Sequence, residues 1–166
     1  VRHTCVPEED RRRRTTPSLR DAPSGRDVKD RSYRFLPHTA DIRMEVRGRD
    51  LPELYAASIE GLFSIMVDRR RIRPAATRTL KISEKYPAGQ LYLVLREALL
   101  LFSSDLFLVR KARVTISKSK VETKVWGEPY DSLRHADSRE VKAVTAHGIT
   151  VDRVSGGCVA RFVVDV

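Results

Sequence analysis

Apolar and polar residues alternate along several short segments in the second half of the chain. The clearest segments are residues 112–117, 121–125 and 141–145. A period of two residues places successive side chains on opposite faces of a strand, so each segment predicts a strand with one buried and one exposed face. Strands of this kind are typical of antiparallel sheets, and this half of the chain therefore predicts one.

Short turn sequences separate these segments. Lys118-Ser119-Lys120 predicts a hairpin turn between the first two, and Ser155-Gly156-Gly157 predicts a final hairpin between residues 149–151 and 159–164. Earlier in the chain, strands are expected at residues 33–36, at residues 42–47 before Gly48, and around Leu80 and Ile82.

Two stretches follow helical spacing instead. Asp50 and Glu53 form an acidic helix-start pair, and Pro52 stands in the first turn, where its missing N–H costs nothing. Apolar residues recur at helical spacing from there, which predicts a helix over residues 51–67. The most apolar stretch, residues 91–101, predicts a second and largely buried helix, and the Pro-Ala-Gly at residues 87–89 predicts a turn before it.

Strands combined with two helices predict an α+β fold with a largely antiparallel sheet. We expect one compact domain over residues 32–166. Residues 1–31 contain four consecutive arginines and almost no apolar residue after Val6. Such a segment cannot bury enough surface to offset the entropy of ordering, so it predicts a disordered, Arg-rich tail.

Charge and composition narrow the class of partner. The net charge is +10, of which the tail supplies +3 through nine Lys/Arg and six Asp/Glu. This excess favours acidic partners such as RNA, although it also serves solubility. The sequence contains no run of about 18 apolar residues, so no transmembrane helix is expected. The N-terminal residues are charged and lack an apolar stretch, so no secretory signal is expected either. Cys5 and Cys158 have no metal-ligand spacing, which favours a reduced, cytoplasmic protein.

Two aspartates stand at the ends of predicted strands. Asp41 directly precedes the strand that begins at Ile42, and Asp165 ends the last strand. If those strands are antiparallel neighbours, both carboxylates lie at one edge of the sheet. Together with the main-chain or terminal oxygen of Val166 they would form an all-oxygen site suited to Ca²⁺ or Mg²⁺. The alternative is that they are ordinary turn and strand-end residues.

The sequence contains no motif of a self-sufficient enzyme. It lacks Gly-x-Ser-x-Gly, His-Glu-x-x-His, Cys-x-x-Cys and a phosphate-binding glycine loop. His38, His135 and His147 stand in or beside loops, which is an ordinary place for histidine. Trp126 could stack on a nucleic-acid base, although a lone aromatic residue after a strand more often packs against protein.

The order of these segments resembles the archease family. The similarity covers most of residues 33–166 and rests mainly on His38-Thr39-Ala40-Asp41 and on Glu140-Val141-Lys142-Ala143-Val144-Thr145, with His147 in register. Gly127-Glu128 and the Asp165-Val166 ending add weaker support. Ala146 departs from the family pattern, which usually has an aromatic residue at that position, and the loss of stacking area would weaken one surface contact.

Archease proteins assist the tRNA-splicing RNA ligase. The resemblance implies an accessory protein, not an enzyme, that promotes guanylylation and multiple turnover of that ligase. It implies a divalent-cation site at Asp41, Asp165 and Val166, with Ca²⁺ expected first and Mg²⁺ or Mn²⁺ as alternatives. The residues expected to line the rim of this site are His38, Glu140 and Lys142. We expect the protein to be a monomer.

Two other functions stay open. A basic RNA-binding module or general chaperone would use residues 69–73 and 118–120 rather than the acidic pair. An independent hydrolase would use the carboxylates with His38. A salt titration of RNA binding without ligase distinguishes the RNA-binding module, because contacts to phosphates weaken steeply as salt rises.

Overall fold

The structure is a computed structural model that describes residues 33–36, 41–136 and 138–166. The predicted tail over residues 1–31 and the predicted rim residue His38 lie outside the described residues. The helices are α1 (Leu51–Met66) and α2 (Pro87–Asp105), with a short 3-10 helix, η2 (Arg69–Arg71). The strands are β1 (Tyr33–Leu36), β2 (Ile42–Gly48), β3 (Ala76–Ser83), β4 (Phe107–Ser117), β5 (Lys120–Pro129), β6 (Ala143–Val154) and β7 (Gly157–Asp165).

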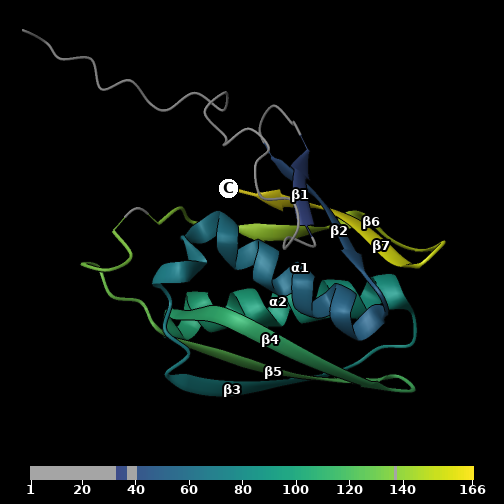
Figure 1. Cartoon of the computed structure of the whole chain (residues 1–166), viewed down its shortest axis with the longest axis horizontal. Coiled ribbons are helices and arrows are strands. Elements are labelled where there is room, and N and C mark those ends of the chain that lie inside the picture. The colour runs from purple at the N-terminus through teal and green to yellow at the C-terminus, as the bar shows by residue number, and fades with distance from the viewer. Residues whose placement is uncertain (1–32, 37–40, 137) are drawn as a thin grey trace, which may run out of the picture. The chain divides into compact units, whose positions relative to one another are not determined.

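The two long helices lie between two antiparallel sheets (Figure 1). One sheet has four strands in the order β1-β2-β7-β6, and the other has three in the order β3-β5-β4. The α+β class, the antiparallel pairing and the two helices are therefore confirmed. The strands divide between two sheets because α1 and α2 are apolar around much of their surface and need a cover on both sides.

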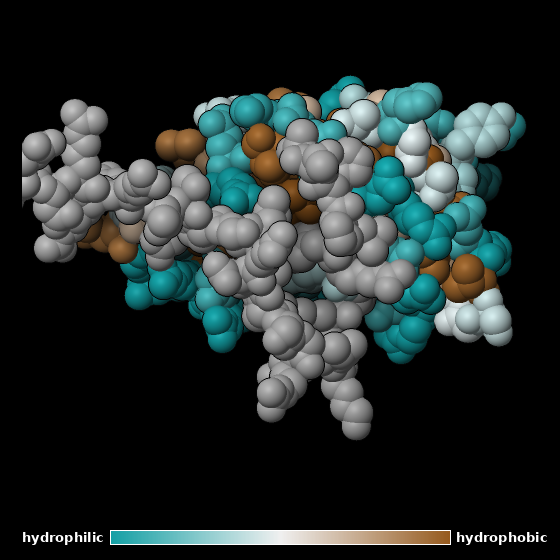
Figure 2. Space-filling model, turned by 90° about the horizontal axis from the view of Figure 1, so that it is seen from above, coloured by the Kyte–Doolittle hydropathy of each residue, from teal (hydrophilic) through white to brown (hydrophobic). Residues whose placement is uncertain are grey.

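The core fills the spaces between the helices and each sheet. From the four-stranded sheet, Met44, Val46, Phe162 and Val164 are buried against the helices. Charged residues lie on the outer face of this sheet, where exposed Arg47 and Arg161 form ion pairs with buried Glu45. Hydrophilic side chains are prominent on the described surface seen from that side (Figure 2). This division follows the predicted alternation of apolar and charged residues along β2.

Helix α1 begins as the sequence predicts. The Asp50 carboxylate accepts a hydrogen bond from the Glu53 N–H at 2.8 Å. Glu53 in turn accepts from the Arg49 N–H at 2.7 Å, one residue earlier than in the usual reciprocal box. These two hydrogen bonds satisfy donors at the helix start and at the residue before it, and so fix where β2 ends and α1 begins.

Two local predictions were wrong. Residues 87–89 form the first turn of α2 rather than a separate turn, because proline at the first helical position needs no hydrogen-bond acceptor. The segments around residues 141–145 and 149–151 belong to one strand, β6, whose register with β7 shifts between Thr145 and Thr150. Gly148, at φ 79°, lies in this irregularity.

Among the described residues, no helix combines the length and apolar character that crossing a bilayer requires.

Candidate metal site

The strands that carry the two aspartates are antiparallel neighbours. Ile42 of β2 pairs with Val164 of β7. One position further out, the same register brings Asp41 opposite Asp165, at the end of the four-stranded sheet. Opposite residues in an antiparallel pair extend their side chains to the same face, with Cβ atoms about 5 Å apart. The predicted site required the two strands to be antiparallel neighbours, and they are. Joint binding of an ion by the two carboxylates stays a prediction.

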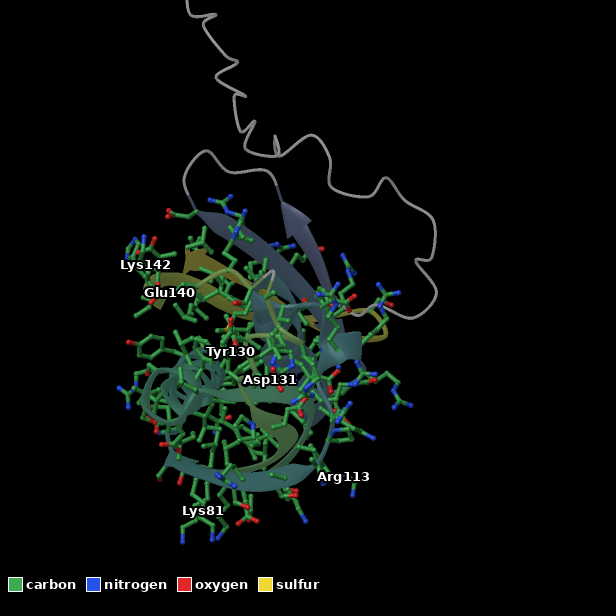
Figure 3. All side chains as sticks on the ribbon, turned by 90° about the vertical axis from the view of Figure 1, so that its left-hand side faces the viewer. Lys81, Arg113, Tyr130, Asp131, Glu140 and Lys142 are labelled. Carbon is green, nitrogen blue, oxygen red and sulfur yellow. The ribbon has the colours of Figure 1, made fainter. Side chains whose placement is uncertain are left out.

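Lys142 binds the C-terminal strand at the same place. Its main-chain N–H donates to the Asp165 carbonyl oxygen at 2.9 Å. Its Nζ lies 3.3 Å from the Val166 carbonyl oxygen. Glu140 and Lys142 lie next to each other beside this sheet, and both are exposed (Figure 3). Four of the predicted site and rim residues, Glu140, Lys142, Asp165 and Val166, are thus gathered around one end of β7, and Asp41 directly precedes the neighbouring strand β2.

The chemistry of these donors fits a hard divalent cation. Two carboxylates and main-chain oxygens are ligands that Ca²⁺ and Mg²⁺ prefer. The Lys142 ammonium lies 3.3 Å from the Val166 oxygen, so it would have to move aside for that oxygen to bind a cation. Within the described part of the chain, no three His, Cys, Asp or Glu side chains are grouped to hold a metal. Main-chain oxygens and water would therefore have to complete the coordination.

A hollow of about 510 Å³ opens beside Asp41 on the outer face of the sheet. His147 and Thr145, from the irregular part of β6, line it together with Asp41 and Arg43. The shift of register at this point turns the β6 backbone, and Gly148 supplies the left-handed conformation that the turn needs. His147 was predicted to be an ordinary loop histidine, and only the fold reveals that it shares a hollow with Asp41.

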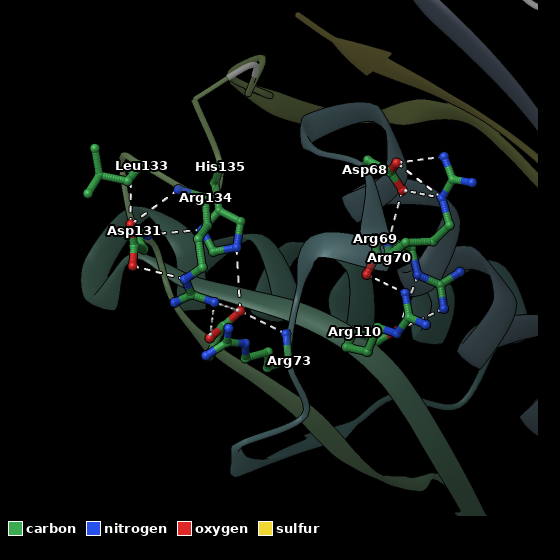
Figure 4. Close-up of polar contacts among 10 residues, drawn as sticks. Asp68, Arg69, Arg70, Arg73, Arg110, Asp131, Leu133, Arg134 and His135 are labelled. Atoms are coloured by element: carbon green, nitrogen blue, oxygen red, sulfur yellow. Dashed lines mark hydrogen bonds and ion pairs between the residues drawn. The ribbon is translucent and has the colours of Figure 1, made fainter.

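A buried ionic network organises the connection from β5 to β6, which carries Glu140 and Lys142 (Figure 4). Glu128 is only 5% exposed. It accepts a hydrogen bond from the Arg73 N–H at 2.7 Å and two from Arg134 Nη1 at 2.7 and 2.8 Å. His135, fully buried, accepts at Nδ1 from the Asp131 N–H at 2.9 Å. Its Nε2 lies 3.4 Å from Glu128 Oε1.

The network sets the charge of its two acids. Burial by itself would raise the pKa of Glu128, but the hydrogen bonds from Arg73 and Arg134 outweigh burial and lower that pKa. The pKa of Asp131 is lowered by the Arg134 guanidinium and by main-chain N–H groups. Both acids are therefore ionised at neutral pH. This network was not predicted from the sequence, because Glu128 and the histidine of the following polar loop are recognisable as partners only once the fold shows their contact.

The connection then continues toward the candidate site. The Ser138 N–H donates to the His135 carbonyl oxygen, and the Arg139 N–H donates to the Met66 carbonyl oxygen at the end of α1, at 2.7 Å. Val141 is buried in the core. These contacts hold the backbone on both sides of Glu140, so the network around Glu128 positions the rim of the candidate site.

Comparisons with known proteins identify the family of this chain. The model of the Archease protein family (MTH1598/TM1083) matches residues 33–166. The chain belongs to the archease family. The protein named "Protein archease" from Thermococcus gammatolerans is 33% identical over 140 residues, which cover 81% of this chain and 99% of that protein. The archease of Sulfurisphaera tokodaii is 30% identical over 136 residues, which cover 81% and 98%.

Solved structures show the same archease fold. The solution structure of protein 1598 from Methanobacterium thermoautotrophicum matches with a TM-score of 0.70 at 23% identity, over 82% of this chain and 99% of that one. The crystal structure of an archease from Thermotoga maritima, described as a possible chaperone, matches with a TM-score of 0.55 at 17% identity, over 79% and 94%.

Proposed function

We propose that this archease-family protein is an accessory protein of the tRNA-splicing RNA ligase in the cytoplasm. It promotes guanylylation and multiple turnover of the ligase and is not itself an enzyme. The proposal rests on membership of the family and on one observation: the pairing of β2 with β7 brings Asp41 to the position opposite Asp165.

Asp41, Asp165 and the Val166 main-chain oxygen would hold a divalent cation, for which Ca²⁺ is the first candidate. Such an ion supplies positive charge that stabilises phosphate oxygens. The role of this protein is to present that positive charge at the end of the four-stranded sheet. The Lys142 main-chain N–H holds the end of β7 by its hydrogen bond to the Asp165 carbonyl oxygen, and Glu140 lies exposed beside it, where a partner protein can contact it.

The test is a multiple-turnover ligation assay with the cognate ligase, GTP and divalent ion. The wild-type protein is expected to raise the number of turnovers per ligase molecule. Asp41→Asn and Asp165→Asn should remove most of this stimulation, because each replaces a charged oxygen donor with a neutral amide. Single-turnover ligation by ligase that is already guanylylated should be unaffected by either variant.

Asp105→Asn is the matched control, because Asp105 is an exposed aspartate that ends α2 and is not part of the four-stranded sheet. This variant should stimulate the ligase as the wild type does. Full stimulation by Asp41→Asn and Asp165→Asn would refute the role of the site. An absence of stimulation by the wild-type protein would refute the function itself.

A further inference from the structure

The outer face of the three-stranded sheet carries a regular array of positive charge. The register places Lys111 beside Trp126, Arg113 beside Lys124, and Lys81 beside Glu122. Lys120 continues the same side of β5 toward the hairpin turn. We call this surface the basic face; its five cationic residues, all exposed, are Lys81, Lys111, Arg113, Lys120 and Lys124.

Strand alternation explains why these cations gather on one side. The residues between them, among them Ala112, Val114, Val121 and Val125, are buried in the core. The basic residues must then lie on the other face, away from the helices. Figure 3 shows Lys81 and Arg113 on this outer side of the sheet.

Most of this charge is not neutralised within the described part of the chain. Of the five cations, Lys81 alone has a carboxylate at ion-pair distance, Glu122 at 3.4 Å. Like charges on adjacent strand positions repel one another, so the face is less stable by itself than a mixed surface would be. An acidic ligand spread over the sheet would relieve this repulsion.

Trp126 lies within this array. Its ring is half-buried, with Lys124 Nζ 5.4 Å and the Arg113 guanidinium carbon 5.9 Å from the ring centroid. A flat aromatic surface flanked by cations can stack on a base while the cations contact the phosphates beside it. Thr77, Thr79 and Thr115 add hydroxyl groups on the same face, which can bond bases and ribose hydroxyls.

The arginines in the basic segment at residues 69–73 make contacts within the protein. The Arg69 guanidinium bonds Glu60 at 2.7 Å. It also bonds the Arg110 carbonyl oxygen (Figure 4). Arg70 forms an ion pair with Asp68 at 2.8 Å. Arg69 and Arg70 therefore help to anchor the loop between α1 and β3. Among the described residues, four of the five cations of the basic face have no carboxylate at ion-pair distance, so their charge is available to a nucleic acid.

We propose that the basic face binds single-stranded RNA, with Trp126 stacked on a base and Lys124 and Arg113 against the flanking phosphates. At the turn end of the sheet, a hollow of about 630 Å³, lined in part by Lys81 and Lys120, provides room for the strand to continue. This binding site is independent of the cation site proposed at Asp41 and Asp165.

The full chain contains one tryptophan, so its fluorescence reports on this face alone. Titration with a single-stranded oligoribonucleotide, without ligase or divalent ion, should quench that fluorescence. A duplex of the same length should not, because its bases are already stacked. Trp126→Leu should weaken binding of a labelled single strand about tenfold.

Charge variants test the same site while keeping Trp126. The double variant Lys124→Gln/Arg113→Gln should make the slope of log affinity against log salt shallower by about 1.4. The matched control is Arg139→Gln/Arg153→Gln, which removes the same charge from exposed positions outside the three-stranded sheet and should leave that slope unchanged. Because every variant keeps residues 1–31, RNA contacts made by that segment would affect all of them equally.

Three results would overturn the proposal. One is unquenched tryptophan fluorescence at saturating RNA. Another is equal salt slopes for the two double variants. The third is a Lys124→Gln/Arg113→Gln protein that binds RNA like the wild type but no longer binds the ligase in the absence of RNA, which would make the basic face a protein-docking surface.

Discussion

At the scale of single residues, Glu128 has a greater structural role than its position near the end of β5 suggests. Its carboxylate accepts hydrogen bonds from Arg73 and Arg134 and lies beside buried His135. Charge-assisted hydrogen bonds to a buried acid are stronger than those between neutral groups. Glu128 therefore connects the loop before β3 to the loop that carries the rim residues of the candidate metal site.

Glu128→Gln is expected to lower the free energy of unfolding at neutral pH by about 2–3 kcal/mol, measured by chemical denaturation. The pKa of Glu128 is lower in the folded state than its usual value of 4.5. Its contribution to stability is therefore fully present above about pH 4.5 and is lost as pH falls through the folded-state pKa. The variant should show a shallower loss of stability below that pH.

Glu97→Gln is the control, because Glu97 pairs on the surface of α2 with exposed Arg96. It should change the free energy of unfolding by less than about 1 kcal/mol. Equal effects of the two substitutions, or an unchanged acid limb in Glu128→Gln, would show that the buried network does not stabilise the fold as described.

At the scale of secondary-structure elements, Gly127 lets β4 and β5 pair closely. A Cβ at this position would lie only 1.8 Å from the Leu108 carbonyl oxygen. The register between the two strands is irregular at the same place, between Val109 and Lys111. A glycine is needed here for close approach of the two backbones and not for an unusual φ angle.

Gly127→Ala should therefore destabilise the protein by about 3 kcal/mol, measured by denaturant unfolding, because the backbone of β4 cannot move without breaking its pairing. Gly148→Ala is the comparison. Its Cβ would meet no atom within 4 Å, so only the left-handed backbone at φ 79° opposes it, at about 1–2 kcal/mol. A Gly127→Ala protein as stable as the wild type would contradict the close approach.

Local patterns predicted these elements well where local chemistry decides them. The start of α1 follows from Asp50, Glu53 and helical spacing, and the strands of the second half follow from alternation. The prediction of a separate turn at residues 87–89 was wrong, because proline and glycine are common both in turns and in the first turn of a helix. The two-sheet arrangement and the register shift in β6 depend on contacts between distant elements, which local patterns do not encode.

At the scale of the whole described fold, the two proposed sites belong to different sheets. The candidate metal site lies at one end of the four-stranded sheet, and the basic face lies on the outer side of the three-stranded sheet, with the helices between (Figure 1). RNA and a cation would therefore not compete for one surface. The protein could then bind RNA on the three-stranded sheet while it presents a bound cation to a partner from the four-stranded sheet.

The residues of the candidate metal site could be predicted only in part. Asp41 and Asp165 were predicted because each stands at a strand end, and the archease resemblance selected them. Their position on neighbouring strands depends on long-range pairing of β2 with β7. His147 and the network around Glu128 could not be assigned, because a histidine in a polar loop has no distinctive pattern until the fold shows its neighbours.

The most direct measurement is a calorimetric titration of the full chain with Ca²⁺ at neutral pH. We expect one ion to bind per chain, and Asp41→Asn and Asp165→Asn each to weaken its binding at least about tenfold, since each removes a charged oxygen donor. Asp105→Asn should bind as the wild type does. If both site variants bind Ca²⁺ with wild-type affinity, the two aspartates do not form the proposed site.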